Sequence, residues 1–370
     1  MRRGERIRFG VVGCGRIGSR HAAHIAANPR AELAAVCDVR EERARAFAAE
    51  YGGAPSSSLA AMLGTPLDVV SICTPSGMHA EMSCAALAAG VHVLCEKPMA
   101  LSLADCERVV RAEAASDRRF FLVKQNRYNA PVRALKDAVF RGRLGRVTLV
   151  GSDVLWNRNR AYYEADDWKG TMAQDGGALM TQCSHFLDLM LWIGGRVTSV
   201  TARMANLAHD YIETEDTGVI QLAFEGGAIG ALTYTTCTYR QSLEGSLSVI
   251  GTDGTVKIGG QYLNSLEQWD VKDLPRPTDA DEVPLLPGAD GTYRSSKSRH
   301  GDVIENVVAV LLDGQDIKTN SAQGRESVEV MQAAYVSALE RREVRLPLTG
   351  ADAAFRLDAA TPFSGRAKGV

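Results

Sequence analysis

Residues 7–18, Ile-Arg-Phe-Gly-Val-Val-Gly-Cys-Gly-Arg-Ile-Gly, decide the fold of the first third of this 370-residue chain. An apolar run enters the pattern Gly-x-Gly-x-x-Gly, and a helical pattern leaves it. The first glycine permits a tight turn, the second lets the backbone approach a pyrophosphate, and the third lets helix and strand pack closely. Free amides and the dipole at the helix N-terminus favour phosphates. The stretch predicts a dinucleotide site that includes Gly13, Cys14, Gly15, Arg16 and Ile17.

Asp38 indicates which dinucleotide binds. It closes the next predicted strand, about 20 residues after the glycines, as this kind of site requires. A carboxylate there accepts hydrogen bonds from both adenosine ribose hydroxyls and repels a 2′-phosphate. Arg40 leaves an alternative open, since a guanidinium could bind that phosphate, although it also fits a solvated residue at a helix start. We predict NAD as the cofactor, with NADP less favoured.

The pattern of strands and helices predicts an α/β protein with two domains. Short apolar runs without polar alternation are typical of strands covered by helices on both faces, here in a doubly wound parallel sheet. Predicted strands are 7–12, 33–37, 69–73, 91–95 and 120–123, and predicted helices are 17–27, 41–51, 78–89 and 103–116.

The pattern changes after Tyr128. Runs of period two are typical of strands with one face on a core. They cover 147–156, 197–204, 218–224, 229–236 and 247–250, with helices at 131–140, 177–193, 303–312 and 326–339. We therefore expect an N-terminal Rossmann domain (1–128), a substrate-binding and oligomerisation α/β domain with a large open, mostly antiparallel sheet (129–348), and a loosely ordered tail (349–370).

Composition excludes several classes of function. A net charge of −2 gives no general attraction to nucleic acid or to an anionic membrane. No apolar run is long enough for a transmembrane helix. None of the eight cysteines forms a C-x-x-C pair, so reduced cysteines in a cytoplasmic protein and no metal site are expected.

Further blocks carry a family resemblance. Cys95-Glu96-Lys97-Pro98 follows the fourth predicted strand, and Thr74-Pro75 follows the third. Asp175-Gly176-Gly177 precedes His185-Phe186-Leu187-Asp188. With the glycine pattern, these blocks resemble the glucose–fructose oxidoreductase/inositol dehydrogenase (Gfo/Idh/MocA) family over residues 6 to 345.

That resemblance implies a nicotinamide-dependent oxidoreductase that binds its substrate between the two domains. It implies that Lys97 is the proton shuttle on the reacting hydroxyl, with His185 beside it as the second catalytic residue. A lysine in a partly desolvated pocket can serve as base and acid in the two directions of the reaction. The predicted cofactor contacts also include Thr74, Pro75, His79, Glu96, Lys97 and Asn126.

Inositol dehydrogenase-like members carry an acidic residue one helical turn before the histidine, and here that position is Thr181. On a continuous helix, Thr181 and His185 would face the same way. Two interpretations of Asp188 stay open: its carboxylate orients the imidazole of His185, or it pairs with a residue elsewhere. His185 itself has the alternative of a satisfied core histidine, and His21 and His24 are expected to contact solvent or a partner domain.

The segment from Trp156 to Gly170 combines polar and aromatic residues that can bind a sugar. Aromatic faces such as Trp156, Tyr163 and Trp168 can cover a sugar ring, while amide and guanidinium groups bind its hydroxyls or an anionic substituent. A lid or subunit contact is the alternative. The predicted substrate residues are Lys97, Gln125, Arg158, Tyr163, Trp168, Lys169, Thr181, Gln182 and His185.

Within the family, several blocks are similar to a branch of UDP-N-acetyl-amino-glucuronate and related sugar dehydrogenases, among them residues 162–170 and 215–218. The resemblance implies hydride transfer at a ring carbon of a pyranoside or nucleotide sugar. C3 is the ring carbon that it favours. The alternatives are a free-sugar, inositol or glycoside dehydrogenase or ketoreductase, and a non-catalytic nucleotide-binding regulator. The open sheet face predicts a homodimer or homotetramer.

Overall fold

The computed structural model describes residues 6–278, 286–287, 294–295, 298–358, 361 and 363. The chain forms two compact units. The first comprises Met1–Gln125 and Arg299–Glu326, and the second Asn126–Ser298 and Ser327–Val370. The chain thus leaves the first unit and returns to it late. No described helix is both long and apolar enough to cross a membrane.

The first unit is built on a six-stranded parallel sheet of order β3-β2-β1-β4-β5-β6. Order reverses between β1 and β4, which places a ligand-binding crevice at the carboxyl ends of those strands. The strands are β1 (Ile7–Val12), β2 (Ala31–Cys37), β3 (Ala54–Ser56), β4 (Val69–Ile72), β5 (His92–Cys95) and β6 (Phe120–Leu122). The helices are α1 (Arg16–Ala27), α2 (Glu41–Tyr51), α3 (Leu59–Leu63), η1 (Ser76–Met78), α4 (His79–Ala88) and α5 (Leu103–Ala114).

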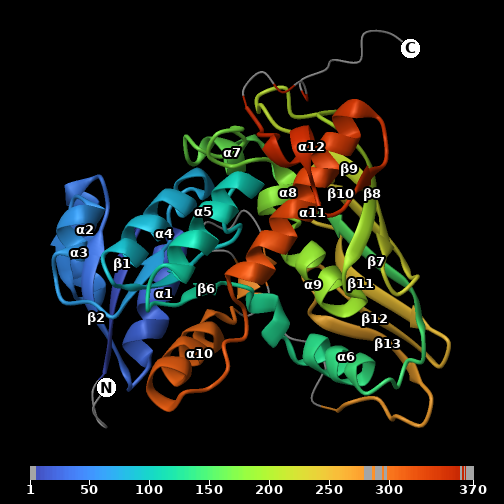
Figure 1. Cartoon of the computed structure of the whole chain (residues 1–370), viewed down its shortest axis with the longest axis horizontal. Helices are drawn as coiled ribbons and strands as arrows, with labels where there is room; N and C mark the ends of the chain where they lie inside the picture. The colour runs from blue at the N-terminus through green and yellow to red at the C-terminus, as the bar shows by residue number, and fades with distance from the viewer. Residues whose placement is uncertain are drawn as a thin grey trace. The chain divides into compact units, whose positions relative to one another are not determined.

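The returning segment completes this unit. Helix α10 (His300–Asp313) packs beside α1, as Figure 1 shows. Asn28 donates to Glu305 at 2.8 Å and Arg30 pairs with Asp313 at 2.7 Å. The Leu122 amide donates to the Thr319 carbonyl at 3.1 Å. Residues 299–326, which the sequence analysis groups with the second domain, therefore pack with the Rossmann sheet.

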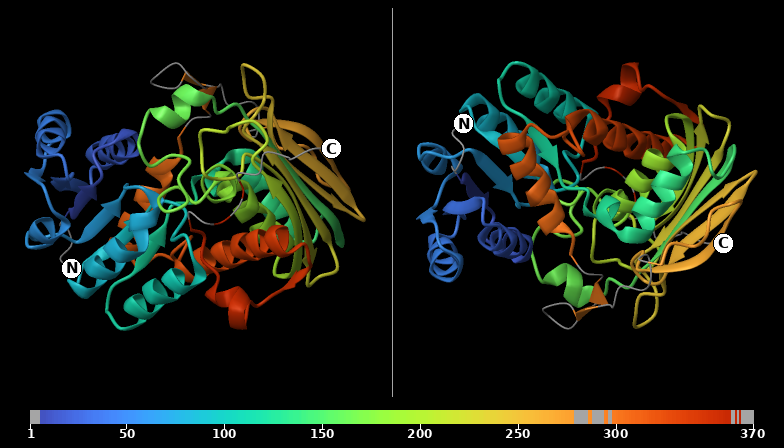
Figure 2. Two further views of the ribbon diagram at one scale, coloured as in Figure 1. Left: turned by 90° about the horizontal axis from the view of Figure 1, so that it is seen from above. Right: turned by 90° about the horizontal axis from the view of Figure 1, so that it is seen from below.

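The second unit is an eight-stranded sheet of order β13-β12-β11-β7-β10-β9-β8-β16. All its neighbouring pairs are antiparallel except β7 with β10. Figure 2 shows this sheet nearly edge-on, with helices on one face. The strands are β7 (Val147–Leu155), β8 (Val197–Ala205), β9 (Thr217–Phe224), β10 (Ile229–Thr235), β11 (Glu244–Gly251), β12 (Gly254–Gly259), β13 (Ser265–Val271) and β16 (Val344–Arg345).

The remaining elements are short or cover this sheet. They are η2 (Gln125–Tyr128), α6 (Ala130–Phe140), α7 (Arg160–Glu164), α8 (Ala178–Thr181), α9 (Ser184–Gly194), β14 (Leu286–Pro287), β15 (Arg294–Ser295), α11 (Ser321–Glu340) and α12 (Gly350–Ala354). Among them, α9 contacts β7, β10 and β11. Its side chains are apolar nearly all round, as expected for a helix covered on most sides.

The predicted fold class is confirmed, with two local corrections. The helix expected over 177–193 is interrupted, because α8 ends at Thr181 and α9 begins at Ser184. The tail expected to be loose contains α12, and the buried Phe363 ring contacts Tyr335 at 5.6 Å. The rest of the predicted tail, residues 359, 360, 362 and 364–370, lies outside the described residues.

Candidate active site

The glycine turn of the first unit has the shape that a dinucleotide needs. Gly13 has φ +94°, and a Cβ there would collide with the Cys73 carbonyl. A Cβ on Gly18 would collide with the Gly13 carbonyl oxygen, so the helix lies directly against the turn. At Gly15, by contrast, no heavy atom lies within 4 Å of a Cβ position. No side chain caps the N-terminus of α1. These residues fit a pyrophosphate against the turn.

Asp38 lies at the end of β2, beside this turn. One carboxylate oxygen accepts from the Cys14 amide at 3.1 Å, and the other from the Arg40 amide at 2.9 Å. The guanidinium that approaches Asp38 is that of Arg43, at 3.9 Å. Since each carboxylate oxygen can accept a second hydrogen bond, the group can still bind ribose hydroxyls. Burial, and then the charge of Asp38, raises the pKa of Cys14 to about 12, so that thiol stays protonated.

His79 joins the two turns that follow β4 and β5. Its ring is buried, with Nδ1 2.7 Å from the Pro98 carbonyl oxygen and Nε2 2.9 Å from the Thr74 carbonyl oxygen. Both ring nitrogens of this predicted cofactor residue therefore lie against backbone. Thr74 and Pro75 lie at the carboxyl edge of the sheet, directly after β4 and Cys73.

Lys97 follows β5 and is half-buried, while Glu96 before it is buried. The Glu96 Oε1 atom lies 3.0 Å from His21 Nε2 and 3.0 Å from His300 Nε2. Its Oε2 accepts from the Lys97 amide at 3.2 Å. Burial alone would raise the pKa of Glu96, but the hydrogen bonds and charge of the two histidines hold it well below its usual range. Glu96 is thus kept as a carboxylate beside Lys97.

Of the two contacts expected for His21, with solvent or with a partner domain, the contact with solvent is wrong, and the ring it meets from the predicted second domain, that of His300, belongs to the first unit. The His21 side chain is fully buried rather than in contact with solvent, because α10 covers α1. Its Nδ1 lies 2.7 Å from Ser71 Oγ, so both ring nitrogens have partners. Burial disfavours the imidazolium, yet hydrogen bonds and charge from Cys73 and Glu96 raise the pKa of His21 to about 10.

In the second unit, a buried carboxyl group supports the Gly-Gly block. Glu215 Oε1 accepts from the Leu179 amide at 2.8 Å and from the Tyr335 hydroxyl at 2.9 Å. A Cβ on Gly177, at φ +106°, would collide with Glu215 and Tyr335. Burial raises the pKa of Glu215 to about 7, even though its hydrogen bonds act to lower it. The contacts of Glu215 and Tyr335 therefore hold the start of α8 in place.

The predicted positions Thr181 and His185 lie on different helices. The Thr181 hydroxyl donates to the Gly177 carbonyl at 3.0 Å, and His185 is half-buried in the first turn of α9. Because the helix is interrupted between them, the same-face argument for these two side chains does not apply. Asp188 makes a two-pronged ion pair with Arg127, at 2.8 and 2.7 Å. Of the two readings of Asp188, the structure therefore shows the pairing elsewhere.

Four of the residues near α7 form one connected cluster. Arg158 Nε donates to Gln182 at 3.0 Å, and Gln182 donates to the Tyr162 hydroxyl at 2.8 Å. The guanidinium of Arg158 and the ammonium of Lys169 lie 5.2 and 4.5 Å from the Tyr162 ring centre. Lys169 also pairs with Asp166 at 2.8 Å. Three predicted substrate residues, Arg158, Lys169 and Gln182, are thus brought together around one aromatic ring.

The aromatic residues of the same segment are more buried than expected. Trp156 packs on Phe186 and Tyr262, and its Nε1 donates to the Gln261 carbonyl at 2.9 Å. Trp156 is therefore a core residue rather than an open face for a sugar. Tyr163 is also buried, whereas Trp168 is half-buried.

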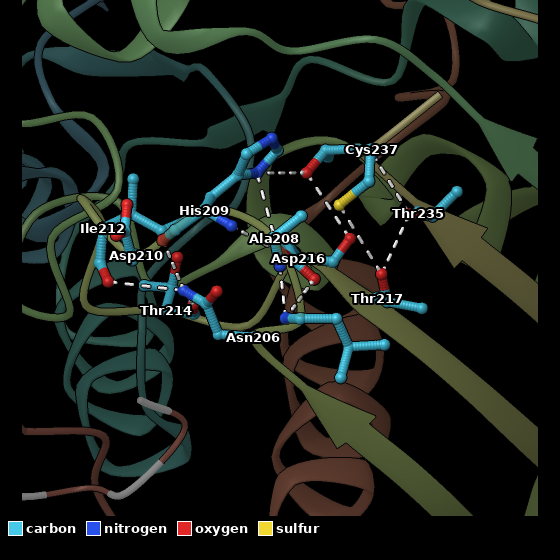
Figure 3. Close-up of polar contacts among 12 residues, drawn as sticks. Asn206, Ala208, His209, Asp210, Ile212, Thr214, Asp216, Thr217, Thr235 and Cys237 are labelled. Carbon is cyan, nitrogen blue, oxygen red and sulfur yellow. Dashed lines mark hydrogen bonds and ion pairs between the residues drawn. The ribbon is translucent and has the colours of Figure 1, made fainter. Parts of the chain in front are cut away.

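The carboxylate of Asp216 organises the loop between β8 and β9 (Figure 3). Asp216 accepts from three successive amides, those of Leu207, Ala208 and His209, at 2.8 to 3.1 Å. Burial opposes the charged form, but these bonds lower the pKa of Asp216. The His209 ring packs 5.5 Å from the Tyr163 ring. Because the oxygens of Asp216 already accept these amides, His209, Asp216 and Cys237 are better explained as loop structure than as a metal site.

Two other predicted residues lie where the two units meet in sequence. Gln125 ends the first unit, and its Oε1 accepts from the Arg299 amide at 3.1 Å. Asn126 begins the second unit, and its carbonyl accepts from the Asn129 amide at 3.2 Å. Their contacts with cofactor or substrate stay predictions.

Comparison with known families settles the class of protein. Residues 7–124 match the oxidoreductase family with an NAD-binding Rossmann fold, and residues 132–257 match the GFO/IDH/MocA C-terminal domain. The chain belongs to the Gfo/Idh/MocA family. The family prediction is confirmed, and the protein is an NAD-dependent oxidoreductase.

Particular relatives narrow the comparison. The chain is 30% identical to myo-inositol 2-dehydrogenase of Thermotoga maritima over 232 residues, which covers 61% of this chain and 67% of that protein. It is 38% identical to the WlbA dehydrogenase of Bordetella pertussis, solved with NADH and UDP-GlcNAcA, with a TM-score of 0.84 over 93% of this chain and 100% of that one. The WlbA dehydrogenase of Chromobacterium violaceum, with the same ligands, is 37% identical with a TM-score of 0.86 over 94% and 97%.

Sequence reasoning missed several residues that shape the site. His300 and Tyr335 lie far along the chain, and no local motif marks them. Glu215 is part of a block used only for the branch resemblance. Arg127 directly follows the predicted residues Gln125 and Asn126, but its bond to Asp188 joins two segments that only the fold brings together.

Proposed function

We propose that the protein oxidises or reduces a ring secondary carbon, C3 foremost, of a pyranoside carried on a nucleotide. The observation that carries the proposal is the 38% identity, over almost the whole chain, to a dehydrogenase solved with NADH and UDP-GlcNAcA. The cationic groups around Tyr162 support it, since Arg158 and Lys169 suit an anionic sugar substituent. NAD would supply the hydride acceptor for oxidation, and NADH would supply the hydride for reduction.

In this proposal, Lys97 moves the proton of the reacting hydroxyl. It follows β5 at the sheet edge where ligands bind in such folds, directly after Glu96, whose carboxylate is held by His21 and His300. His185 is proposed as the second catalytic residue on the family pattern. Lys97 belongs to the first unit and His185 to the second. Lys97 is tested by its own substitution.

A second candidate is an inositol or free-sugar dehydrogenase. The 30% identity to myo-inositol 2-dehydrogenase favours it. Thr181 argues against this candidate, because inositol dehydrogenase-like members of the family carry an acidic residue at that position. A nucleotide-binding regulator without chemistry would bind NADH but turn over nothing.

The test is a panel of UDP-sugars, UDP-uronates, free sugars and inositols, followed through nicotinamide absorbance, with products identified by NMR. The proposal expects turnover of a UDP-linked sugar and a 3-keto product. A 2-keto or 4-keto product removes the C3 assignment alone. Turnover confined to inositols or small hydroxy acids contradicts the nucleotide-sugar assignment, and NADH binding without any turnover supports the regulator.

We further propose a homodimer or homotetramer formed through the open face of the second sheet. Ile229, Leu149 and Ile250 form a cross-strand row on β10, β7 and β11, and all three are exposed. Val219 on β9 is also exposed. An exposed apolar row on a sheet is typical of an interface between subunits.

A further inference from the structure

Three buried histidines from three helices converge on the residues that flank Lys97. His21 comes from α1, His79 begins α4, and His300 begins α10. Each has a relative exposure of 2% or less. All three belong to the first unit, although His300 comes about 200 residues after Lys97 in the sequence.

On one side of Lys97, His21 and His300 both hold the carboxylate of Glu96. Each Nε2 lies 3.0 Å from the same oxygen, Oε1. The second oxygen accepts from the Lys97 amide at 3.2 Å, so the fixed carboxylate holds the backbone of Lys97 directly.

On the other side, His79 holds the carbonyl of Pro98. Its second ring nitrogen lies 2.9 Å from the Thr74 carbonyl oxygen, and the neutral ring, with a single N–H, donates to one of these two carbonyls at a time. The Lys97 amide on one side and the Pro98 carbonyl on the other are therefore held through buried imidazoles, and the Lys97 side chain starts from a fixed base.

We propose that His21, His79 and His300 are positioning residues that fix the Glu96–Lys97–Pro98 backbone so that the Lys97 side-chain nitrogen meets the reacting oxygen, as the amine that takes the hydroxyl proton in oxidation or the ammonium that gives it back in reduction. This inference rests on the proposed role of Lys97. Proton transfer requires the two heavy atoms within hydrogen-bond reach, and a displacement of about 1 Å can cost about 10²-fold in rate.

The same side chains offer a second explanation. Ligand atoms of His21, Glu96 and His300 lie within 4.8 Å of one another, as in a site for a divalent cation. The distances of 3.0 Å are ordinary hydrogen-bond lengths, and Ser71 already contacts the other nitrogen of His21. We therefore favour hydrogen bonding, and metal analysis is part of the test.

The test uses three variants of α10 in the full-length protein. His300→Leu removes the N–H, while His300→Gln returns an amide N–H at a similar reach. Ile304→Ala is the packing control, since Ile304 is buried one turn later on the same helix. We expect His300→Leu to lower kcat at least tenfold with NADH affinity unchanged, and His300→Gln to recover most of it. Ile304→Ala should lower Tm without lowering kcat.

Several results would overturn the proposal. They are a wild-type kcat in His300→Leu, no recovery in His300→Gln, an equal loss of kcat in Ile304→Ala, or one equivalent of bound metal that His300→Leu loses.

A readout without substrate separates this inference from the proposed function. The rate at which an amine-reactive reagent labels Lys97, followed by peptide mass spectrometry, reports its surroundings even if no sugar is turned over. We expect a change of severalfold in His300→Leu and a return toward the wild-type rate in His300→Gln. An unchanged labelling rate in His300→Leu would contradict the positioning role, whatever the substrate panel shows.

Discussion

Single residues decide which nicotinamide cofactor this protein prefers. Asp38 closes β2, and its carboxylate is held by the Cys14 and Arg40 amides in a fixed position beside the glycine turn. Arg40 faces this site through its backbone amide, and the nearby guanidinium is that of Arg43. The carboxylate can therefore select against a 2′-phosphate without moving.

Asp38→Ser should shift the preference from NAD toward NADP. A hydrogen bond to a charged group contributes about 1.5–3 kcal/mol, so the ratio of kcat/KM for the two cofactors should change about tenfold or more. Steady-state kinetics with both cofactors measures the ratio. Arg40→Ala is the matched control and should leave it nearly unchanged. A wild-type enzyme that uses both cofactors equally would show that this reading of Asp38 is wrong.

Glu215 should make stability depend on pH. Burial raises its pKa in the folded protein to about 7, above its ordinary value of 4.5, so folding takes up a proton between these values. Glu215 therefore contributes fully to the free energy of unfolding at pH 4.5 and below. This contribution is lost as the pH rises toward 7, at about 1.4 kcal/mol for each unit of pKa difference.

Glu215→Gln removes this titration but keeps an amide of the same size. The Tm of the variant minus that of the wild type should be more positive at pH 8 than at pH 5. Glu225→Gln, at an exposed position, is the control and should give the same difference at both pH values. A pH-independent difference for Glu215→Gln would contradict the assignment.

Among the elements, the regular strands and helices of the Rossmann unit were predictable from the sequence, because buried parallel strands and amphipathic helices have distinct periods. The predicted range 41–51 coincides with α2. The short β3 and α3 were not predicted, since three to five residues carry too little pattern. The break between α8 and α9 was missed because residues 177–193 contain no proline or other helix breaker after Gly177.

The ion pair between Arg127 and Asp188 ties η2 to α9 within the second unit, and both side chains are buried. Removing one partner takes this two-pronged ion pair away from a buried charge, which costs about 3–5 kcal/mol. Denaturant unfolding of Arg127→Leu and Asp188→Leu should each show a loss of this size.

The double variant, Arg127→Leu with Asp188→Leu, should lose clearly less than the sum of the two single losses. Arg133→Leu, on the neighbouring α6, is a surface control. Strictly additive losses would mean that the two side chains do not depend on each other.

At the scale of the whole molecule, the sequence predicted two domains but not which late residues belong to each. Residues 299–326 pack with the first unit through α10, and His300 is brought to Glu96 in this way. No local pattern in residues 299–326 marks that return, because α10 has the apolar face of any packed helix. Candidate residues near motifs, such as Lys97, could therefore be proposed from the sequence, while supporting residues far from motifs could not.

The oligomer prediction also belongs to this scale. Ile229→Asp places a charge in the exposed row on β7, β10 and β11, and burying an unpaired charge is strongly unfavourable. Light scattering should show a dimer or tetramer for the wild type and a smaller species for the variant. A wild-type protein that is monomeric at micromolar concentration would contradict the prediction.

The central claim is that Lys97 moves the proton during NAD-dependent oxidation or reduction of a sugar. Lys97→Ala tests it most directly, with Lys272→Ala, on an exposed turn, as the control. With the best sugar of the panel, we predict that Lys97→Ala lowers kcat about 10²-fold or more, the usual contribution of a positioned proton donor or acceptor, and leaves the Kd for NADH nearly unchanged. A Lys97→Ala enzyme with the kcat and pH dependence of the wild type would contradict the account.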